Sequence, residues 1–262
     1  MIMRRSRRCD KCRPPSYDGA VPRSWQLLTD DPAERATFSD LASTLALEAE
    51  PAGPPNRLRQ VSCIKTLERR YFLKSFTQTQ WKNRVHFATS SPRAVDDADR
   101  ERRVTDALRR AGYGAPRPVA YGRDGAASYY LCAALPGSSL AALLSGGGLA
   151  QALAVEAARH CGLLLAEGFR LPDLSADHVF LDQDGGLHVL DLHNGGIARP
   201  GAPPRRLLKR VLRRFGRSAQ GLPITQVTAM RFATRLLRTA GTSARQRRAL
   251  LDSAEPLAPS GP

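Results

Sequence analysis

Two short apolar runs separated by a glycine turn organise the hydrophobic pattern of the chain. Val179–Leu181 forms the first run, 187–190 forms the second, and Asp184-Gly185-Gly186 lies between them. Glycine tolerates the positive φ that tight hairpin turns need, so this pattern predicts a β-hairpin. A hairpin returns the chain to its starting point. Residues that flank this one are therefore expected to share one corner of the fold.

The remaining pattern predicts strands first and helices afterwards. Strands are expected at 58–67, 71–76, 119–121 and 128–133, and helices at 139–144, 149–167, 205–215 and 225–239. Ser91-Pro92 is a typical helix start, so a further helix is expected from 91 to 111. These elements divide the chain into a sheet-rich unit at 57–135 and a helical unit at 136–251. We expect 1–56 to be a basic, Pro-rich, partly disordered extension with a short helix within 32–47, and 252–262 to be a loose tail.

One lysine stands out in the second predicted strand. Phe72, Lys74 and Phe76 alternate along 71–76 and therefore point to one face. A lysine between two aromatic residues is unusual for a solvated strand, which indicates a functional lysine. The alternative is a lysine whose stem covers apolar surface while its amine reaches water.

The helix predicted at 91–111 carries a carboxylate on its least polar side. Glu101 falls in that stripe, whereas Asp97, Arg100 and Arg103 are expected on the exposed side. A carboxylate on a buried face needs a cation, and Lys74 is the candidate. The alternative is a glutamate at the rim of the helix that pairs with an arginine of the same helix.

Two acids and a histidine flank the hairpin. Asp173 precedes it, His178 follows Asp173 by five residues, and Asp191 comes directly after the second apolar run. Acids held close together raise the free energy of the fold unless a cation or a proton transfer uses them. The pattern therefore indicates a polar site at this corner.

Composition points to an anionic partner. The 262 residues contain 40 Lys and Arg against 24 Asp and Glu, which gives a formal net charge of +16. The predicted helix that begins at Arg205 and ends at Phe215 has an apolar stripe surrounded by basic residues, which suits an anionic membrane surface. The five cysteines are odd in number, which indicates reduced thiols, and Cys9 and Cys12 have no second ligand pair for zinc. No signal peptide or membrane span is expected.

The spacing of Asp173, His178 and Asp191 resembles the catalytic half of the protein-kinase fold. In that fold a metal-binding side chain follows the catalytic Asp by five residues, and a second metal-binding Asp follows a hairpin. His178 in place of Asn, Asp-Leu-His in place of Asp-Phe-Gly, and His-Val-Phe-Leu resemble the lipopolysaccharide core kinases of Gram-negative bacteria. The resemblance covers roughly 61–237. It implies an α+β, two-lobed fold, with a small antiparallel-sheet N-lobe carrying one helix and a mainly helical C-lobe.

The resemblance also implies roles for individual residues. Asp173 would be the catalytic residue, and Asp191 and His178 would be ligands of the metal ion. The cofactors would be ATP and Mg²⁺. Lys74, fixed by Glu101, would contact the donor phosphates, as in the family's Tyr-Phe-Leu-Lys. Leu135 lies in the hinge before Pro136-Gly137, where backbone groups would hold the adenine. The acceptor would be a heptose or Kdo sugar of the lipopolysaccharide inner core, at the cytoplasmic face of the membrane.

Several departures keep other functions open. No Gly-rich phosphate loop precedes Val61, Leu171-Pro172 replaces His-Arg, and Ser175 stands where protein kinases place a lysine. The alternatives are a kinase of another small molecule or of a protein, and an inactive kinase-like binding protein. The charge also permits a nucleic-acid binder, but no recognised motif supports one.

Overall fold

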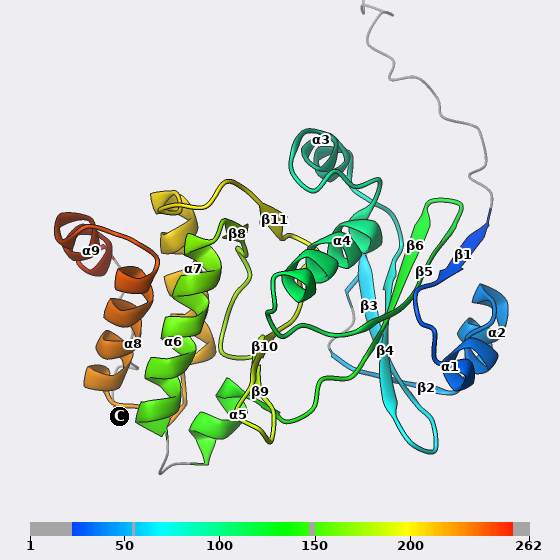
Figure 1. Cartoon of the computed structure of the whole chain (residues 1–262), viewed down its shortest axis with the longest axis horizontal. Helices are drawn as coiled ribbons and strands as arrows, with labels where there is room; N and C mark the ends of the chain where they lie inside the picture. Colours follow the sequence, from blue (N-terminus) through cyan, green and yellow to red (C-terminus); the bar gives the residue numbers. More distant parts are fainter. Residues whose placement is uncertain (1–22, 54–55, 147–149, 254–262) are drawn as a thin grey trace, which may run out of the picture.

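The computed structural model describes residues 23–53, 56–146 and 150–253. A sheet with α4 against it forms one half of the molecule, and a group of helices forms the other (Figure 1). This is the predicted α+β arrangement of two lobes. Cys9 and Cys12 lie outside the described residues.

The sheet of the N-lobe is antiparallel throughout. In the described chain it has six strands in the order β1-β5-β6-β4-β3-β2. The predicted strand pair at 58–67 and 71–76 is confirmed as β3 and β4, and the strands at 119–121 and 128–133 as β5 and β6. The strands are β1 (Ser24–Leu27), β2 (Ala49–Pro51), β3 (Arg59–Lys65), β4 (Arg70–Phe76), β5 (Pro118–Asp124) and β6 (Ala127–Ala133).

Strand β4 divides its side chains between two hydrophobic clusters. Tyr71 and Leu73 pack with Phe38 on one face of the sheet. Phe76, with the partly buried Phe72, packs with Ala98 of α4 on the other face. Because side chains alternate along a strand, Lys74 lies on the face that α4 covers, and it is buried.

Helix α4 (Asp97–Arg110) begins later than the sequence predicted. Ser91-Pro92 is not its start, because the Asp96 carboxylate accepts a hydrogen bond from Asp99 N at 2.8 Å and caps the helix there. The prediction that Asp97 and Arg100 are exposed is also wrong. Both are buried, and only Arg103 of the three predicted charges is exposed.

The expected extension contributes structure between 23 and 53. Strands β1 and β2 form the two edges of the sheet, and α1 (Pro32–Thr37) and α2 (Leu41–Ala46) lie between them in the chain. A short helix was expected within 32–47, and the structure has two there, whereas the edge strands on either side were not expected. Asp31 and Asp40 cap the two helices, and these short capping signals were hidden in a Pro-rich and polar composition. Helix α3 (Trp81–Thr89) was also not predicted.

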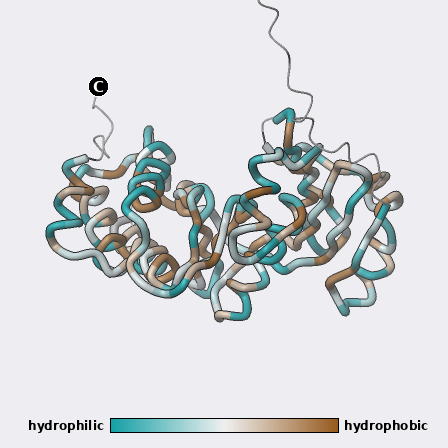
Figure 2. Tube along the Cα trace, turned by 90° about the horizontal axis from the view of Figure 1, so that it is seen from above, coloured by the Kyte–Doolittle hydropathy of each residue, from teal (hydrophilic) through white to brown (hydrophobic). Residues whose placement is uncertain are grey.

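The C-lobe consists mainly of helices. Figure 2 shows this helical half beside the sheet half, with many hydrophilic positions on its outer turns. Gly162 of α6 lies so close to α8 that a Cβ atom would come within 2.6 Å of Leu236 O, so only glycine permits this packing. The helices are α5 (Leu140–Ser145), α6 (Ala150–Ala166), α7 (Arg205–Ser218), α8 (Gln226–Thr239) and α9 (Ala244–Leu251), of which α9 was not predicted.

The predicted hairpin is present between the lobes. Strands β9 (Val179–Leu181) and β10 (Leu187–Val189) are antiparallel, and β7 (Ser138–Ser139) pairs with β9. Gly137, in the segment that joins the lobes, has φ 84° and its Cβ position is blocked by Leu181 O. Outside the hairpin, β8 (Phe169–Arg170) pairs with β11 (Gly196–Ile197). These short pairs fix both ends of the segment from 170 to 197.

Two further expectations concern thiols and membranes. Cys132 and Cys161 are buried free thiols, and burial raises the pKa of each to about 12. Among the described helices, none combines the length and the apolar character needed to cross a bilayer.

A buried glutamate attaches the N-terminal segment to the sheet. Both carboxylate oxygens of Glu34 in α1 accept hydrogen bonds from Arg117, with additional bonds from Thr29 and Tyr71 at 2.6 and 2.9 Å. Burial alone would raise the pKa of Glu34, but these donors lower it to about 2. The ionised carboxylate is therefore part of the folded structure.

We expect Glu34→Gln to lower the free energy of unfolding by roughly 3 kcal/mol at pH 7, because a pKa that is lowered on folding stabilises the folded state above the unfolded pKa. This stabilisation is lost as pH falls from about 4 through the folded value of about 2. Urea unfolding at several pH values should show the deficit of the variant roughly halving between pH 7 and pH 3. The exposed Glu50→Gln variant is the control, and a pH-independent deficit for Glu34→Gln would contradict this account.

Candidate functional site

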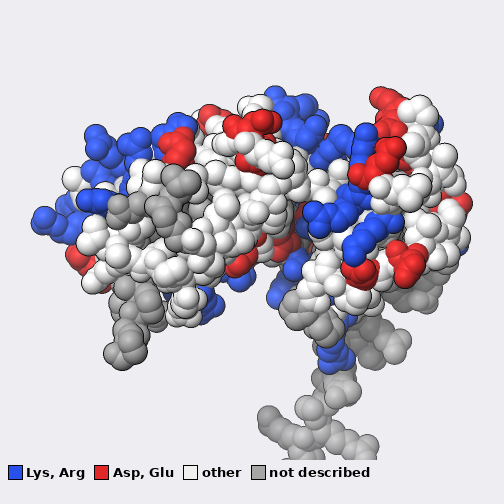
Figure 3. All heavy atoms as spheres, turned by 90° about the horizontal axis from the view of Figure 1, so that it is seen from below, with Lys and Arg blue, Asp and Glu red and all other residues white. Residues whose placement is uncertain are grey.

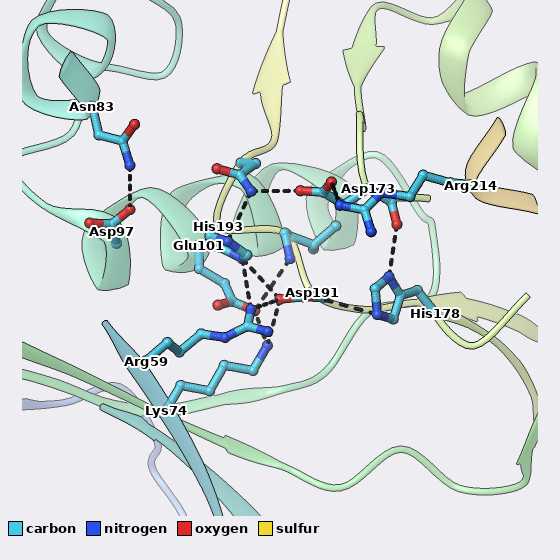
Figure 4. A network of polar contacts seen from close by, with 12 residues as sticks. Arg59, Lys74, Asn83, Asp97, Glu101, Asp173, His178, Asp191, His193 and Arg214 are labelled. Atoms are coloured by element: carbon cyan, nitrogen blue, oxygen red, sulfur yellow. Dashed lines mark hydrogen bonds and ion pairs between the residues drawn. The ribbon is translucent and has the colours of Figure 1, made fainter. Parts of the chain in front are cut away.

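A lysine and two acids form the centre of the site. Lys74 Nζ of β4 bonds to Glu101 Oε1 of α4 and lies 3.7 Å from Asp191 Oδ1 (Figure 4). All three side chains are nearly excluded from solvent. Burial alone would lower the pKa of Lys74, but the charges of Glu101 and Asp191 raise it, so the lysine is a cation. The predicted pairing of Lys74 with Glu101 is confirmed.

Asp191 has an unusual backbone and several cationic neighbours. Its φ of 63° lies in the left-handed region, which aspartate tolerates better than most residues and which often marks a functional position. Arg59 Nη1 of β3 lies 2.5 Å from Asp191 Oδ1, and His193 Nδ1 lies 2.9 Å from the same oxygen. Burial alone would raise the pKa of Asp191, but Lys74, His193 and Arg59 together hold it far below its ordinary value. The side chain is an anion.

The loop after Asp191 is held against α4. Arg100 is buried, and its Nε donates to Gly195 O at 2.6 Å. Its Nη1 donates to Pro92 O, in the loop before α4. The backbone N–H of Leu192 donates to Glu101 Oε1 at 3.3 Å. One turn of α4 therefore positions both Lys74 and the Asp191 loop.

Asp173 lies on the opposite wall and is also an anion. Asn194 Nδ2 donates to its Oδ2 at 2.6 Å, and Arg210 and Arg214 of α7 both donate to its Oδ1 at 2.7 Å. Burial alone would raise the pKa of Asp173, but these hydrogen bonds and charges lower it. Asp173 therefore stays ionised at neutral pH.

His178 connects the two acidic residues. Its Nδ1 lies 2.8 Å from the Asp173 backbone carbonyl, which can only accept, so Nδ1 carries the proton. Its Nε2 lies 3.6 Å from Asp191 Oδ2. The ring thus lies between the loop that bears Asp173 and Asp191, which follows the hairpin.

Asp173, His178 and Asp191 border a polar cavity of about 490 Å³ between the lobes. Figure 4 shows Lys74 and Arg59 reaching in from the sheet, and Asp173 and Arg214 facing them from the other side. The volume is in the range of small-molecule sites. The lining includes Arg59, Asp97, Asp173, His178, Asp191, His193, Asn194 and Arg214.

The residues around Asp191 suit a hard cation. Ligand atoms of Glu101, Asp191 and His193 lie within 4.8 Å of one another. Glu101 Oε2 is buried and has no hydrogen-bond partner among the described residues, so a carboxylate oxygen is available. Carboxylate oxygens are the ligands that Mg²⁺ prefers. Arg59 and Lys74 also lie close to Asp191 Oδ1.

The structure brings most of the predicted site residues together. Lys74, Glu101, Asp173, His178 and Asp191 all contribute to one network, whereas none of the described contacts of this network involves Leu135. Other members of the network were not predicted, and most of them have partners 21 to 132 positions away in the chain, although His193 contacts Asp191 only two positions away. The only sequence signals were the Asp-Leu-His-Asn run and the basic helix. The missed residues are Arg59, His193, Asn194, Arg210 and Arg214.

Comparison with known proteins supports the fold. A scan of protein-family models and a search of curated proteins give no match. Among solved structures, WaaP in complex with acyl carrier protein is 21% identical with a TM-score of 0.63, covering 87% of this chain and 95% of that chain. WbdD, solved with a kinase inhibitor, is 18% identical with a TM-score of 0.46, covering 76% and 43%. An aminoglycoside-3'-phosphotransferase of type VIII is 17% identical with a TM-score of 0.47, covering 78% and 92%. The likeness to WaaP carries the argument: the chain has a protein-kinase-like fold.

We expect Lys74→Met to lower the free energy of unfolding by about 3–5 kcal/mol, because it leaves two buried carboxylates without their shared cation. Lys65→Met is the matched control, since Lys65 lies on the same strand pair but forms an exposed ion pair with Glu50. Urea unfolding between pH 6 and pH 9 should show a constant difference. Over this range Lys74, whose pKa is raised, and Asp191, whose pKa is lowered, both keep their charges. Equal unfolding midpoints for the two variants would refute the structural role of Lys74.

Proposed function

We propose that the protein is an ATP- and Mg²⁺-dependent phosphotransferase that phosphorylates a hydroxyl of a heptose or Kdo sugar in the lipopolysaccharide inner core. The observation that carries the proposal is that Asp173, His178 and Asp191 line one cavity within a protein-kinase-like fold, with the buried Lys74–Glu101 ion pair directly beside Asp191. Phosphoryl transfer depends mainly on positioning and charge neutralisation, which this set of side chains can supply.

In the proposed reaction each wall of the cavity has its own task. On the sheet side, Lys74 binds donor phosphate oxygens while Glu101 keeps its amine in place. Asp191, with His178 beside it, holds the metal ion, which when bound neutralises charge on the transferred phosphate. On the other side, Asp173 orients the acceptor hydroxyl and accepts its proton. The backbone near Leu135 holds the adenine.

Arg59 adds a second cation on the donor side. Val61 is paired with Lys74 in the register of β3 and β4, so Arg59 lies two residues further along the neighbouring strand and on the same face. The sequence between β2 and β3 contains a single glycine, Gly53, and is therefore not a Gly-rich run that binds phosphates through backbone N–H groups. We propose that Arg59 moves from Asp191 to the donor phosphates when nucleotide and metal bind.

The proposed place of action is the cytoplasmic face of the membrane, bound peripherally. Figure 3 shows Lys and Arg side chains on both halves of one face, with Asp and Glu side chains among them. A net charge of +16 supports attraction to anionic lipid or to an already phosphorylated glycan. The outward basic residues of α7 are the proposed lipid contact.

We expect Asp191→Asn to reduce phosphate transfer from ATP by about 100-fold or more, because it removes the anion that holds the metal ion while asparagine still tolerates a φ of 63°. Transfer of labelled phosphate to a panel of inner-core fragments, with and without Mg²⁺, is the measurement. Asp184→Asn, at the exposed tip of the same hairpin, serves as the control and should retain activity. Transfer by Asp191→Asn at the wild-type rate would overturn the proposal.

An inactive kinase-like binding protein is the second candidate. In this structure Arg210, Arg214 and Asn194 contact Asp173, and Arg59 contacts Asp191, so both key acids already have partners. Binding of ATP without transfer to any acceptor in the panel would favour this candidate. Transfer only to unrelated small molecules or proteins would instead indicate a kinase of another acceptor.

A further inference from the structure

Two arginines of α7 point toward Asp173. Arg210 and Arg214 are one helical turn apart, and each places an Nη2 atom 2.7 Å from Asp173 Oδ1. Figure 4 shows Arg214 directed at Asp173, and Arg214 also lines the cavity. Meanwhile Leu208, Val211 and Leu212 bury the opposite side of the helix in the C-lobe. The position of the two guanidinium groups is therefore fixed by the packing of α7.

The charges at this point do not balance. Helix α7 has seven Lys and Arg residues and no Asp or Glu in its fourteen positions. Two of its cations share one oxygen of one carboxylate, and the other oxygen already accepts from Asn194. Holding Asp173 in place would need only one of these donors. A positive charge is left over beside the acceptor side of the cavity.

The two side chains are also open to a ligand. Arg210 and Arg214 are 50% and 45% exposed, whereas Asp173 is 6% exposed. Among the described residues, each guanidinium contacts only Asp173, so most of its five N–H donors are free. The planar fork of arginine binds carboxylates and phosphates through paired hydrogen bonds. The arrangement matches an anionic group better than a neutral one.

We infer that Arg210 and Arg214 form a binding subsite for a carboxylate or phosphate group of the acceptor, next to the hydroxyl that receives the phosphate. This inference rests on the proposed function, since it takes Asp173 as the residue that binds that hydroxyl. Because both arginines touch Asp173, the anionic group lies about 4–6 Å from the reacting hydroxyl, given ordinary hydrogen-bond lengths. That distance corresponds to substituents on one sugar ring. The subsite selects acceptors whose sugar itself carries the negative charge.

Binding measurements with paired probes test the inference. Titration calorimetry in the presence of Mg²⁺ and a non-hydrolysable ATP analogue would compare Kdo with its neutral methyl ester, and a heptose phosphate with unphosphorylated heptose. We expect the wild-type chain to bind at least one charged probe about tenfold or more tightly than its neutral partner. Selectivity for Kdo would identify a carboxylate, and selectivity for heptose phosphate would identify a phosphate.

Variants separate the subsite from general basic charge. Arg210→Gln/Arg214→Gln should lose the discrimination between charged and neutral probes. Arg231→Gln/Arg238→Gln, which removes the same charge from exposed positions of α8, should keep it. Thermal melts show whether the double variant is folded. The single variants Arg210→Gln and Arg214→Gln replace it if it is not. Equal affinity of the wild-type chain for charged and neutral probes, or full discrimination in the double variant, would overturn the inference.

The two proposals fail in different ways. Absence of Mg²⁺-dependent nucleotide binding would count against the proposed function, whatever the sugars do. Normal nucleotide binding without any discrimination between the probes would reject the subsite alone.

Discussion

The ion network around Lys74 is the interaction on which the arrangement of the lobes depends. Lys74 comes from the sheet, Glu101 from α4, and Asp191 from the loop after the hairpin. Removing three charges from water raises the free energy of each group, and only their mutual contacts compensate. The network therefore favours one relative position of these three segments. Arg100 strengthens the same junction by tying α4 to Gly195.

The cavity has a different electrostatic character on each wall. On the proposed donor side, two cations from the sheet contact Asp191, so phosphates and a metal ion would replace existing contacts without leaving a buried charge unpaired. On the acceptor side, the cations outnumber the single carboxylate of Asp173. In the proposed reaction, negative charge would move from the first wall toward the second, and the excess positive charge on the second wall would attract the anionic acceptor inferred above.

Local patterns in the sequence predicted the fold and the centre of the site, because those features depend on short spacings. The glycine turn predicted the hairpin, and the alternation in β4 placed Lys74 on the buried face toward Glu101. The predicted start of α4 was wrong because Ser91-Pro92 and Asp96 are both good cap signals. Only the packing of Asp97 and Arg100 selects Asp96 as the cap. The arginines were missed because their partners are distant in the chain. Arg59 is separated from Asp191 by 132 positions, and Arg214 from Asp173 by 41.

Two roles are proposed for the positive charge of the chain, attraction to an anionic membrane and binding of an anionic ligand. Composition cannot separate them. A helix with cations on its polar side has the same sequence pattern whether those cations meet water, lipid or a ligand. In α7 the buried side chains of Leu208, Val211 and Leu212 set the rotation of the helix. This rotation directs Arg210 and Arg214 toward Asp173, while Arg205 reaches Ala249 O of α9. A surface that only attracts a membrane has no need for a carboxylate partner. The shared contact with Asp173 is thus the feature that separates the ligand-facing part of the charge from the rest.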